Sequence, residues 1–151
     1  MAGSDIGLNY ASAFIETLGS PEAIDHAAQE LESLASVMKM LPSLTRVLGH
    51  PGMELARRRT ILGEVLDKIE PQASTRRFLQ IVLEKGRIAE TASIAVGFAA
   101  LRDARLNLAS GEVVTVVPID AKEQDEWKLT LARLSGRSVR LSFRTDSALL
   151  G

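Results

Sequence analysis

Apolar residues recur every three or four positions along most of the chain up to about residue 108, which is the spacing of amphipathic helices. Ser20 followed by Pro21 is a typical helix start, and Gly86 after Lys85 is a typical helix end. The pattern predicts six helical segments, at about residues 6–18, 21–41, 44–48, 53–69, 75–85 and 88–108. Residues 1–109 are therefore predicted to form a six-helix bundle.

The pattern changes after residue 109. Residues 113–119 are mostly β-branched, which favours a strand. Asp120 with Glu123 is a capping-box pattern, and it opens a helix that should end at Gly136. From residue 138 to 144, apolar and polar side chains alternate, which is typical of a half-buried strand. Because a helix of this length joins the two strands, we expect a crossover connection and parallel pairing.

The predicted fold is mainly α, with the six-helix bundle followed by a small, incomplete α+β domain of strand, helix and strand at residues 110–151. A two-stranded sheet rarely stands without further strands or covering helices, so we expect the second domain to lack part of its sheet. Trp127 on its helix is predicted to pack in the core or against the sheet rather than to anchor a partner.

The amino-acid composition excludes several classes of function. The chain has 151 residues, of which 46% are apolar and 25% charged, as in ordinary soluble globular proteins. The formal net charge of -1 provides no positive excess for binding phosphates, and the absence of cysteine excludes disulfides, thiolate nucleophiles and sulfur-ligated zinc. No apolar run approaches the ~20 residues of a membrane span. The first residues lack the features of a signal peptide. We therefore expect no membrane span and no signal peptide, and the cytoplasm fits this composition.

Few residues in the sequence are candidates for catalysis or for binding a metal or cofactor. His26 and His50 are the only histidines, and their surroundings favour structural roles. Glu30 and Glu32 are predicted to lie on a solvated helix face rather than to form a catalytic pair. The sequence has neither the glycine-rich phosphate loop nor the dinucleotide-binding glycine pattern. We expect a non-catalytic protein with no cofactor and no metal site.

The basic residues form two clusters, Arg57, Arg58 and Arg59, and Arg76 and Arg77. No aromatic residues are interleaved with them as stacking platforms for bases. A solvated or salt-bridged face is the preferred interpretation, and a helical nucleic-acid-binding domain that uses these arginines is the alternative function.

Several segments in order resemble the delta subunit of rotary F-type ATP synthases, the oligomycin-sensitivity-conferring protein of mitochondria. The N-terminal Tyr-Ala-Ser-Ala-Phe is similar to the opening helix of that family, and the stretch from Phe78 to Arg87 is similar to its Phe-Leu-x-x-Leu-x-x-x-x-Arg motif. The resemblance is carried by residues 10–14, 48–51, 78–87, 111–119, 134–139 and 146–151. In the family the last of these motifs continues into further strand and a basic helix, so the chain resembles a member that lacks the C-terminal end.

The resemblance implies a peripheral-stalk adaptor that links the catalytic head to the b-type stalk subunits and so supports ATP synthesis coupled to proton transport. It implies a peripheral location on the cytoplasmic face of the bacterial inner membrane. The N-terminal helix of an alpha subunit would lie in a groove between the first and fifth helices, while stalk binding through the residues after Gly111 would be weakened. The implied groove lining is Tyr10, Ala11, Ala13, Phe14, Phe78, Leu79, Ile81 and Val82.

Overall fold

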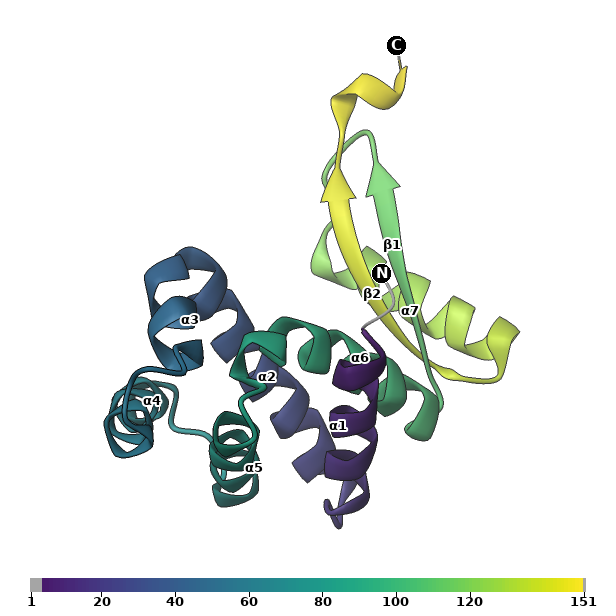
Figure 1. Ribbon diagram of the computed structural model, residues 1–151. Helices are drawn as coiled ribbons and strands as arrows, with labels where there is room; N and C mark the ends of the chain where they lie inside the picture. The colour runs from purple at the N-terminus through teal and green to yellow at the C-terminus, as the bar shows by residue number, and fades with distance from the viewer. Residues whose placement is uncertain (1–3, 151) are drawn as a thin grey trace. The chain divides into compact units, whose positions relative to one another are not determined.

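The computed structural model describes residues 4–150, and the chain divides into two compact units, Met1–Arg102 and Asp103–Gly151 (Figure 1). The division lies near the end of the sixth helix, a few residues before the domain boundary expected after residue 109.

The first unit is helical, and the predicted mainly α architecture is confirmed. Its described residues form α1 (Asp5–Glu16), α2 (Pro21–Met40), α3 (Pro42–Gly49), α4 (Leu55–Ile69), α5 (Ala73–Glu84), a 3-10 turn η1 (Ile88–Glu90) and α6 (Thr91–Arg105), whose last turn runs into the second unit. Within the described part of the chain, no helix combines the length and the apolar character that crossing a membrane requires.

Serine side chains begin the first two helices. The Ser4 hydroxyl accepts a hydrogen bond from the Gly7 amide at 3.0 Å, and the Ser20 hydroxyl accepts one from the Ala23 amide at 3.1 Å. These bonds satisfy amides that the first turn of a helix leaves without backbone partners. Pro21 occupies the first helical position, where its missing N–H costs nothing. The helix start predicted at Ser20 and Pro21 is confirmed.

The sixth helix is shorter than predicted. The chain from Ile88 first forms the tighter turn η1, and the Thr91 hydroxyl donates to the Ile88 carbonyl at 2.6 Å where α6 begins. At the other end, Asn107 has a left-handed backbone with φ of 53°, a conformation that asparagine tolerates better than most residues. This residue breaks the helix, so Leu108 belongs to the following strand.

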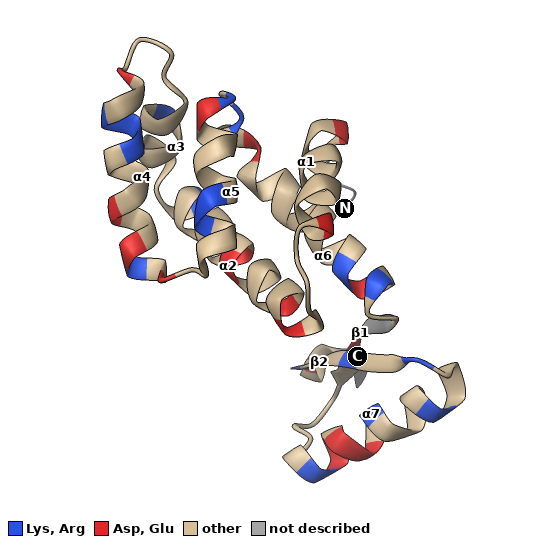
Figure 2. Cartoon of the chain, turned by 90° about the horizontal axis from the view of Figure 1, so that it is seen from below, with Lys and Arg blue, Asp and Glu red and all other residues tan. Residues whose placement is uncertain are grey.

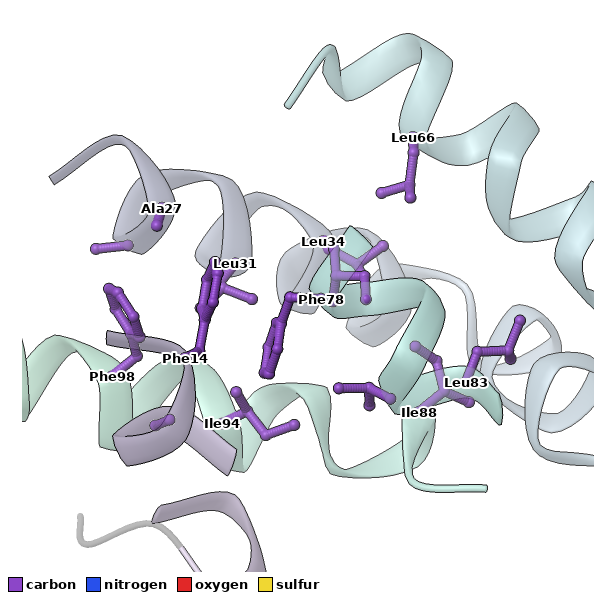
Figure 3. Close-up of a cluster of buried hydrophobic side chains, with 14 of the residues drawn as sticks. Phe14, Ala27, Leu31, Leu34, Leu66, Phe78, Leu83, Ile88, Ile94 and Phe98 are labelled. Atoms are coloured by element: carbon purple, nitrogen blue, oxygen red, sulfur yellow. The ribbon is translucent and has the colours of Figure 1, made fainter. Parts of the chain in front are cut away.

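The core of the first unit is aliphatic with three phenylalanines. Figure 3 shows Phe14 and Phe78 side by side, with Phe98 beyond Phe14 and Leu31 of α2 facing them. The largest fully buried side chains are apolar except for Thr75, and the apolar ones are Phe98, Leu31, Leu34, Leu48, Leu62, Leu66, Leu79, Leu83, Ile88, Ile94 and Val82. Because α2 to α6 all contribute to this set, and α1 adds Phe14, the six helices share one core.

Helix α1 lies very close to α6. A Cβ atom at Gly7 would stand 2.7 Å from the backbone carbonyl carbon of Ser93, so only glycine fits. The Ser93 hydroxyl donates to the Ser4 hydroxyl at 2.8 Å, and the Ser4 hydroxyl donates to Glu90 at 3.1 Å. The N-terminal end of α1 is thereby fixed beside η1, which follows the C-terminal end of α5.

A polar brace joins α2 to the start of α5. Glu30 accepts a hydrogen bond from the Gln72 amide at 2.8 Å, and the Gln72 side chain donates to the Ala23 carbonyl at 2.9 Å. The second carboxylate oxygen of Glu30 is buried. The predicted solvated position of Glu30 is wrong, because its carboxylate turns inward to cap α5, a helix whose own N-cap residue makes no side-chain cap bond.

The second unit contains β1 (Leu108–Thr115), α7 (Ala121–Ser135), β2 (Ser138–Thr145) and a short η2 (Ser147–Leu150). The strands pair in parallel with Val113 opposite Phe143, as the crossover argument predicts. The Asp120 side chain accepts from the Glu123 amide at 2.8 Å, and Gly136 ends α7 with φ of 67°. The predicted helix start at Asp120 and the predicted helix end at Gly136 are confirmed.

The first strand begins earlier and ends earlier than the predicted 113–119. Its partner β2 starts at Ser138, which pairs with Leu108, so the ladder extends back to the end of the preceding helix. Beyond Thr115 the backbone turns, and the Thr115 hydroxyl donates to the Val117 carbonyl at 2.7 Å. Pro118 has no N–H with which to continue a ladder, which fits the end of pairing here.

Helix α7 contains no buried residue. Trp127 is 48% exposed and Leu134 is 78% exposed, so the prediction that Trp127 packs in a core is wrong. The described sheet has two strands, and two strands offer too narrow a surface to cover the apolar face of a four-turn helix. On β2, by contrast, Val139, Leu141 and Phe143 are partly buried between exposed neighbours, as the alternating pattern predicts.

Candidate functional site

A groove of about 420 Å³ runs between α1 and α5. Each helix contributes four side chains at the spacing i, i+3, i+4 and i+7, which places them in one stripe along the helix. The lining consists of Tyr10, Ala13, Phe14 and Thr17 from α1, and Ser74, Arg77, Phe78 and Ile81 from α5. We call this site the α1–α5 groove.

The floor of the α1–α5 groove is aromatic. The rings of Phe14 and Phe78 are stacked with centroids 4.1 Å apart and planes 3° apart, and Tyr10 meets Phe78 edge-on at 6.5 Å. Phe14 also contacts the fully buried Phe98, with ring centroids 5.4 Å apart. Because both floor rings also belong to the core, the shape of the floor is fixed by the folding of the bundle.

The two helices run in opposite directions along the groove. Ser4 at the start of α1 is bonded to Glu90, just beyond the end of α5. Gln72 at the start of α5 is bonded to Ala23, near the start of α2 and so close to the end of α1. Tyr10 and Ile81 therefore mark one end of the groove.

The other end of the groove is polar, since it carries Thr17, Ser74 and Arg77. A ligand that fills the α1–α5 groove would thus meet an apolar surface at the Tyr10 end and polar groups at the other.

The predicted lining residues fall into two sets. Tyr10, Ala13, Phe14, Phe78 and Ile81 line the groove. The other three, Ala11, Leu79 and Val82, are 0%, 1% and 0% exposed and lie in the core instead. Helical periodicity accounts for the split, because both helices are apolar on two adjoining stripes, of which one faces the bundle and the other faces the groove.

Three lining residues were not predicted. Thr17 lies one turn from Phe14 and Ser74 one turn from Phe78, while Arg77 lies between Ser74 and Ile81, about one turn from each. Helical spacing places these three residues on the groove stripes, but the apolar pattern does not include them because they are polar.

The arginine clusters are largely engaged within the protein. Arg59 pairs with Glu84 at 2.7 Å, and Arg76 pairs with Asp67 at 2.9 Å. Arg58 donates to the carbonyl of Met53 at 3.1 Å and to that of Leu48 at 3.3 Å. Figure 2 shows basic and acidic residues interspersed on α4 and α5 rather than one basic face. The salt-bridged interpretation is confirmed for Arg59 and Arg76.

The described residues offer little for catalysis. His26 and His50 are exposed, and His50 accepts a hydrogen bond from the Gly52 amide at 3.0 Å. Among residues 4–150 there is no group of three or more histidine or acidic side chains that could hold a metal ion. The groove contains no carboxylate and no histidine, so its lining is suited to binding an apolar surface rather than to acid–base chemistry.

A family model described as ATP synthase delta (OSCP) subunit matches residues 6–151. The chain belongs to this family. As a member, it is a non-catalytic subunit in the peripheral stalk of an F-type ATP synthase, and it supports ATP synthesis coupled to proton transport as part of that complex. The alternative of a nucleic-acid-binding domain gains no support from family membership.

Relatives named ATP synthase subunit delta occur in several bacteria. The one from Geobacter metallireducens is 26% identical over 151 residues, which is 100% of this chain and 84% of that subunit. The one from Desulforamulus reducens is 29% identical over 147 residues, which is 97% of this chain and 80% of that subunit.

A chain in the cryo-EM structure of the Toxoplasma gondii mitochondrial ATP synthase hexamer has a similar fold. The TM-score is 0.67 at 16% identity, and the likeness covers 95% of this chain and 79% of that chain. At this level of identity the likeness concerns the fold, which extends across both the helical and the strand–helix–strand regions.

Proposed function

We propose that the α1–α5 groove binds the N-terminal helix of the alpha subunit and so attaches the peripheral stalk to the catalytic head. The observation that carries the proposal is the stacked pair of Phe14 and Phe78, which forms an apolar floor open to a ligand between two helices. Family membership supplies the complex in which the partner is found.

The size of the groove suits the apolar face of a helix. A volume of about 420 Å³ is too small for a whole helix but holds several side chains that project from one face. An amphipathic helix presents such side chains at every third or fourth position. The exposed Ile81 and the partly buried Tyr10 would then flank the anchors on either side.

A stalk attachment must dissociate slowly under torque. Dissociation rates depend mainly on well-packed apolar anchors at the centre of an interface, whereas exposed ion pairs contribute little. The aromatic floor meets this requirement because its rings are rigid and are supported from behind by Phe98.

Calorimetry with a synthetic peptide would test the proposal. The peptide would span the first ~25 residues of the alpha subunit from the same organism, which is about 37 Å of helix. Ile81→Glu should weaken binding by at least ~10-fold, because it places a charge in the apolar part of the groove. Val96→Glu is a matched control, since Val96 on α6 is 41% exposed against 43% for Ile81 but does not line the groove.

Two results would overturn this assignment. One is no heat of binding with the unmodified chain at tens of micromolar peptide. The other is equal affinity of the Ile81→Glu and Val96→Glu variants. Sedimentation of the chain alone is a necessary companion measurement, because self-association abolished by Ile81→Glu would identify a second copy as the occupant.

We further propose that the second unit binds the b-type stalk subunits and that the chain lies on the cytoplasmic face of the bacterial inner membrane. Exposed apolar side chains on α7 support a docking role for this unit, namely Trp127, Leu129 and Leu134. Leu134→Glu should reduce capture of the b subunit, while Ile81→Glu should leave it unchanged. In inverted membrane vesicles an added antibody should reach the chain, and in right-side-out vesicles it should not.

A further inference from the structure

Arg77 is a charged residue in the wall of a groove whose other lining side chains are uncharged. Within residues 4–150 its side chain has no hydrogen-bond or ion-pair partner. The neighbouring arginines differ, since Arg76 is paired with Asp67 at 2.9 Å and Arg59 with Glu84 at 2.7 Å. Arg76 and Arg77 are adjacent in sequence but differ in orientation by the ~100° that separates consecutive helical residues, so one faces α4 and the other faces the groove.

The position of Arg77 along the groove determines which part of a docked helix it would meet. It lies with Ser74 and Thr17 at the polar end, opposite the end marked by Tyr10 and Ile81. One helical turn separates it from Ile81 on the same stripe. A ligand helix with apolar anchors beside Tyr10 and Ile81 would therefore place a residue about one turn beyond those anchors next to the Arg77 guanidinium.

Binding of any helix in the groove removes water from around Arg77. A cation that loses water without gaining a partner opposes binding, whereas a carboxylate in reach restores the lost interactions through charge-assisted hydrogen bonds. Guanidinium groups are well suited to this role because their planar fork can bind both carboxylate oxygens at once.

From this we infer that Arg77 pairs with an aspartate or glutamate of the docked helix and so sets which end of that helix lies at the polar end of the groove. The inference rests on the proposed function, in that it assigns a charged contact to the same groove. The partner is accordingly an amphipathic helix with an acidic residue one turn from its apolar anchors. A helix with a lysine or arginine at that position is rejected.

The experiment compares Arg77→Gln with Arg76→Gln in calorimetric titrations of the alpha-subunit N-terminal peptide. Arg77→Gln should weaken binding about 3- to 10-fold, as expected for a partly desolvated charge pair. Arg76→Gln makes the same chemical change one residue away and should have an effect of less than about 2-fold. Arg77→Lys should fall between Arg77→Gln and the unmodified chain, because it keeps the charge but loses the fork.

Peptides with each acidic residue replaced in turn by its amide identify the partner carboxylate. One such peptide should bind the unmodified chain 3- to 10-fold more weakly, by about the same factor as Arg77→Gln, and should bind Arg77→Gln with no additional loss. Arg77→Glu combined with a peptide in which that residue is lysine should recover most of the affinity. Raising the salt from about 50 to about 300 mM should weaken binding to the unmodified chain more than to Arg77→Gln.

The outcomes separate the two proposals. Binding of the peptide to the unmodified chain with equal loss for Arg77→Gln and Arg76→Gln, or with no peptide carboxylate coupled to Arg77, overturns this inference and leaves the groove assignment standing. No binding to the unmodified chain overturns both. Because Arg77 has no partner within the described chain, the Arg77 variants should unfold at the same temperature as the unmodified protein, which thermal unfolding would verify.

Discussion

The helical unit and the strand–helix–strand unit treat their apolar residues in different ways. In the first unit, Leu31 and Leu34 of α2 are completely buried by the surrounding helices. In the second unit, α7 has no buried residue, and Leu129 and Leu134 are 66% and 78% exposed. Similar amphipathic patterns thus lead to a closed core only where enough other elements are present to cover them. The first unit should therefore be sensitive to substitution in its interior, while the second should be tolerant.

The largest contrast should come from leucine truncations on α2 and α7. Leu31→Ala should lower the free energy of unfolding by about 2–5 kcal/mol, because it removes a fully buried side chain and leaves a cavity. Leu129→Ala should change the free energy of unfolding by less than about 0.5 kcal/mol. Urea denaturation followed by circular dichroism measures both values, and a loss at Leu129 as large as that at Leu31 would remove the distinction between the units.

A glycine pair tests how tightly the first unit is packed. Gly7→Ala should destabilise it by about 1–3 kcal/mol, because the new methyl group would stand 2.7 Å from the Ser93 backbone. Gly63→Ala on α4 meets nothing within 4 Å and should stabilise the protein by up to about 1 kcal/mol, since alanine is the better helix former. Thermal unfolding should therefore show shifts of opposite sign, and shifts of the same sign would contradict the close approach of α1 to α6.

The polar brace between α2 and α5 offers a test that does not involve apolar packing. Glu30→Ala should cost about 1–2 kcal/mol, because it leaves the Gln72 amide without its partner. Glu32→Ala on the same helix is exposed and should be nearly neutral. If both glutamates prove equally dispensable in chemical denaturation, the brace does not stabilise the junction.

In the second unit, the N-terminal cap of α7 should contribute more to stability than any apolar side chain on that helix. Asp120→Ala removes the bond from the Glu123 amide and should cost about 1 kcal/mol of helix stability. Asp120→Asn keeps an acceptor and should restore most of this loss. Hydrogen exchange of the amides in the first turn of α7 provides the readout, and equal protection in the two variants would count against the cap.

The smallest effect is expected at Trp127, which is the only tryptophan in the chain and is 48% exposed. Its fluorescence should be quenched by acrylamide in the folded protein almost as efficiently as in urea. Trp127→Phe should change the free energy of unfolding by less than about 1 kcal/mol. Strong protection from acrylamide would mean that α7 is covered, contrary to the contrast between the two units.

Much of the secondary structure was predictable because its determinants are local. Two helix starts depend on a side chain that bonds an amide of its own first turn, at Ser20 before Pro21 and at Asp120 before Glu123. One helix end depends on Gly136, which allows the left-handed backbone conformation found there. Such signals require no knowledge of what lies across the core. The sixth helix ends earlier than the pattern predicts because Asn107, rather than a glycine, adopts the left-handed conformation there.

The candidate site was only partly predictable. Phe14 and Phe78 were expected in the groove and do line it, while Ala11 was expected there and lies in the core. Periodicity shows that a residue is on the apolar side of its helix, but it cannot distinguish the stripe that faces the bundle from the stripe beside it. The sequence predicts a solvated or salt-bridged position for Arg77, and only the direction of α5 places it in the groove.

The sequence alone predicts the number and order of the helices, several of their ends, the parallel strand–helix–strand unit and the family, because each depends on local bonds, on periodicity or on ordered motifs. Tertiary structure alone decided that Glu30 turns inward to Gln72 and that Trp127 stays exposed. It also decided that the α1–α5 groove combines an aromatic floor with an arginine at one end. The physical reason is that burial and pairing depend on which surfaces meet, and the residues that meet here are separated by tens of positions in the chain.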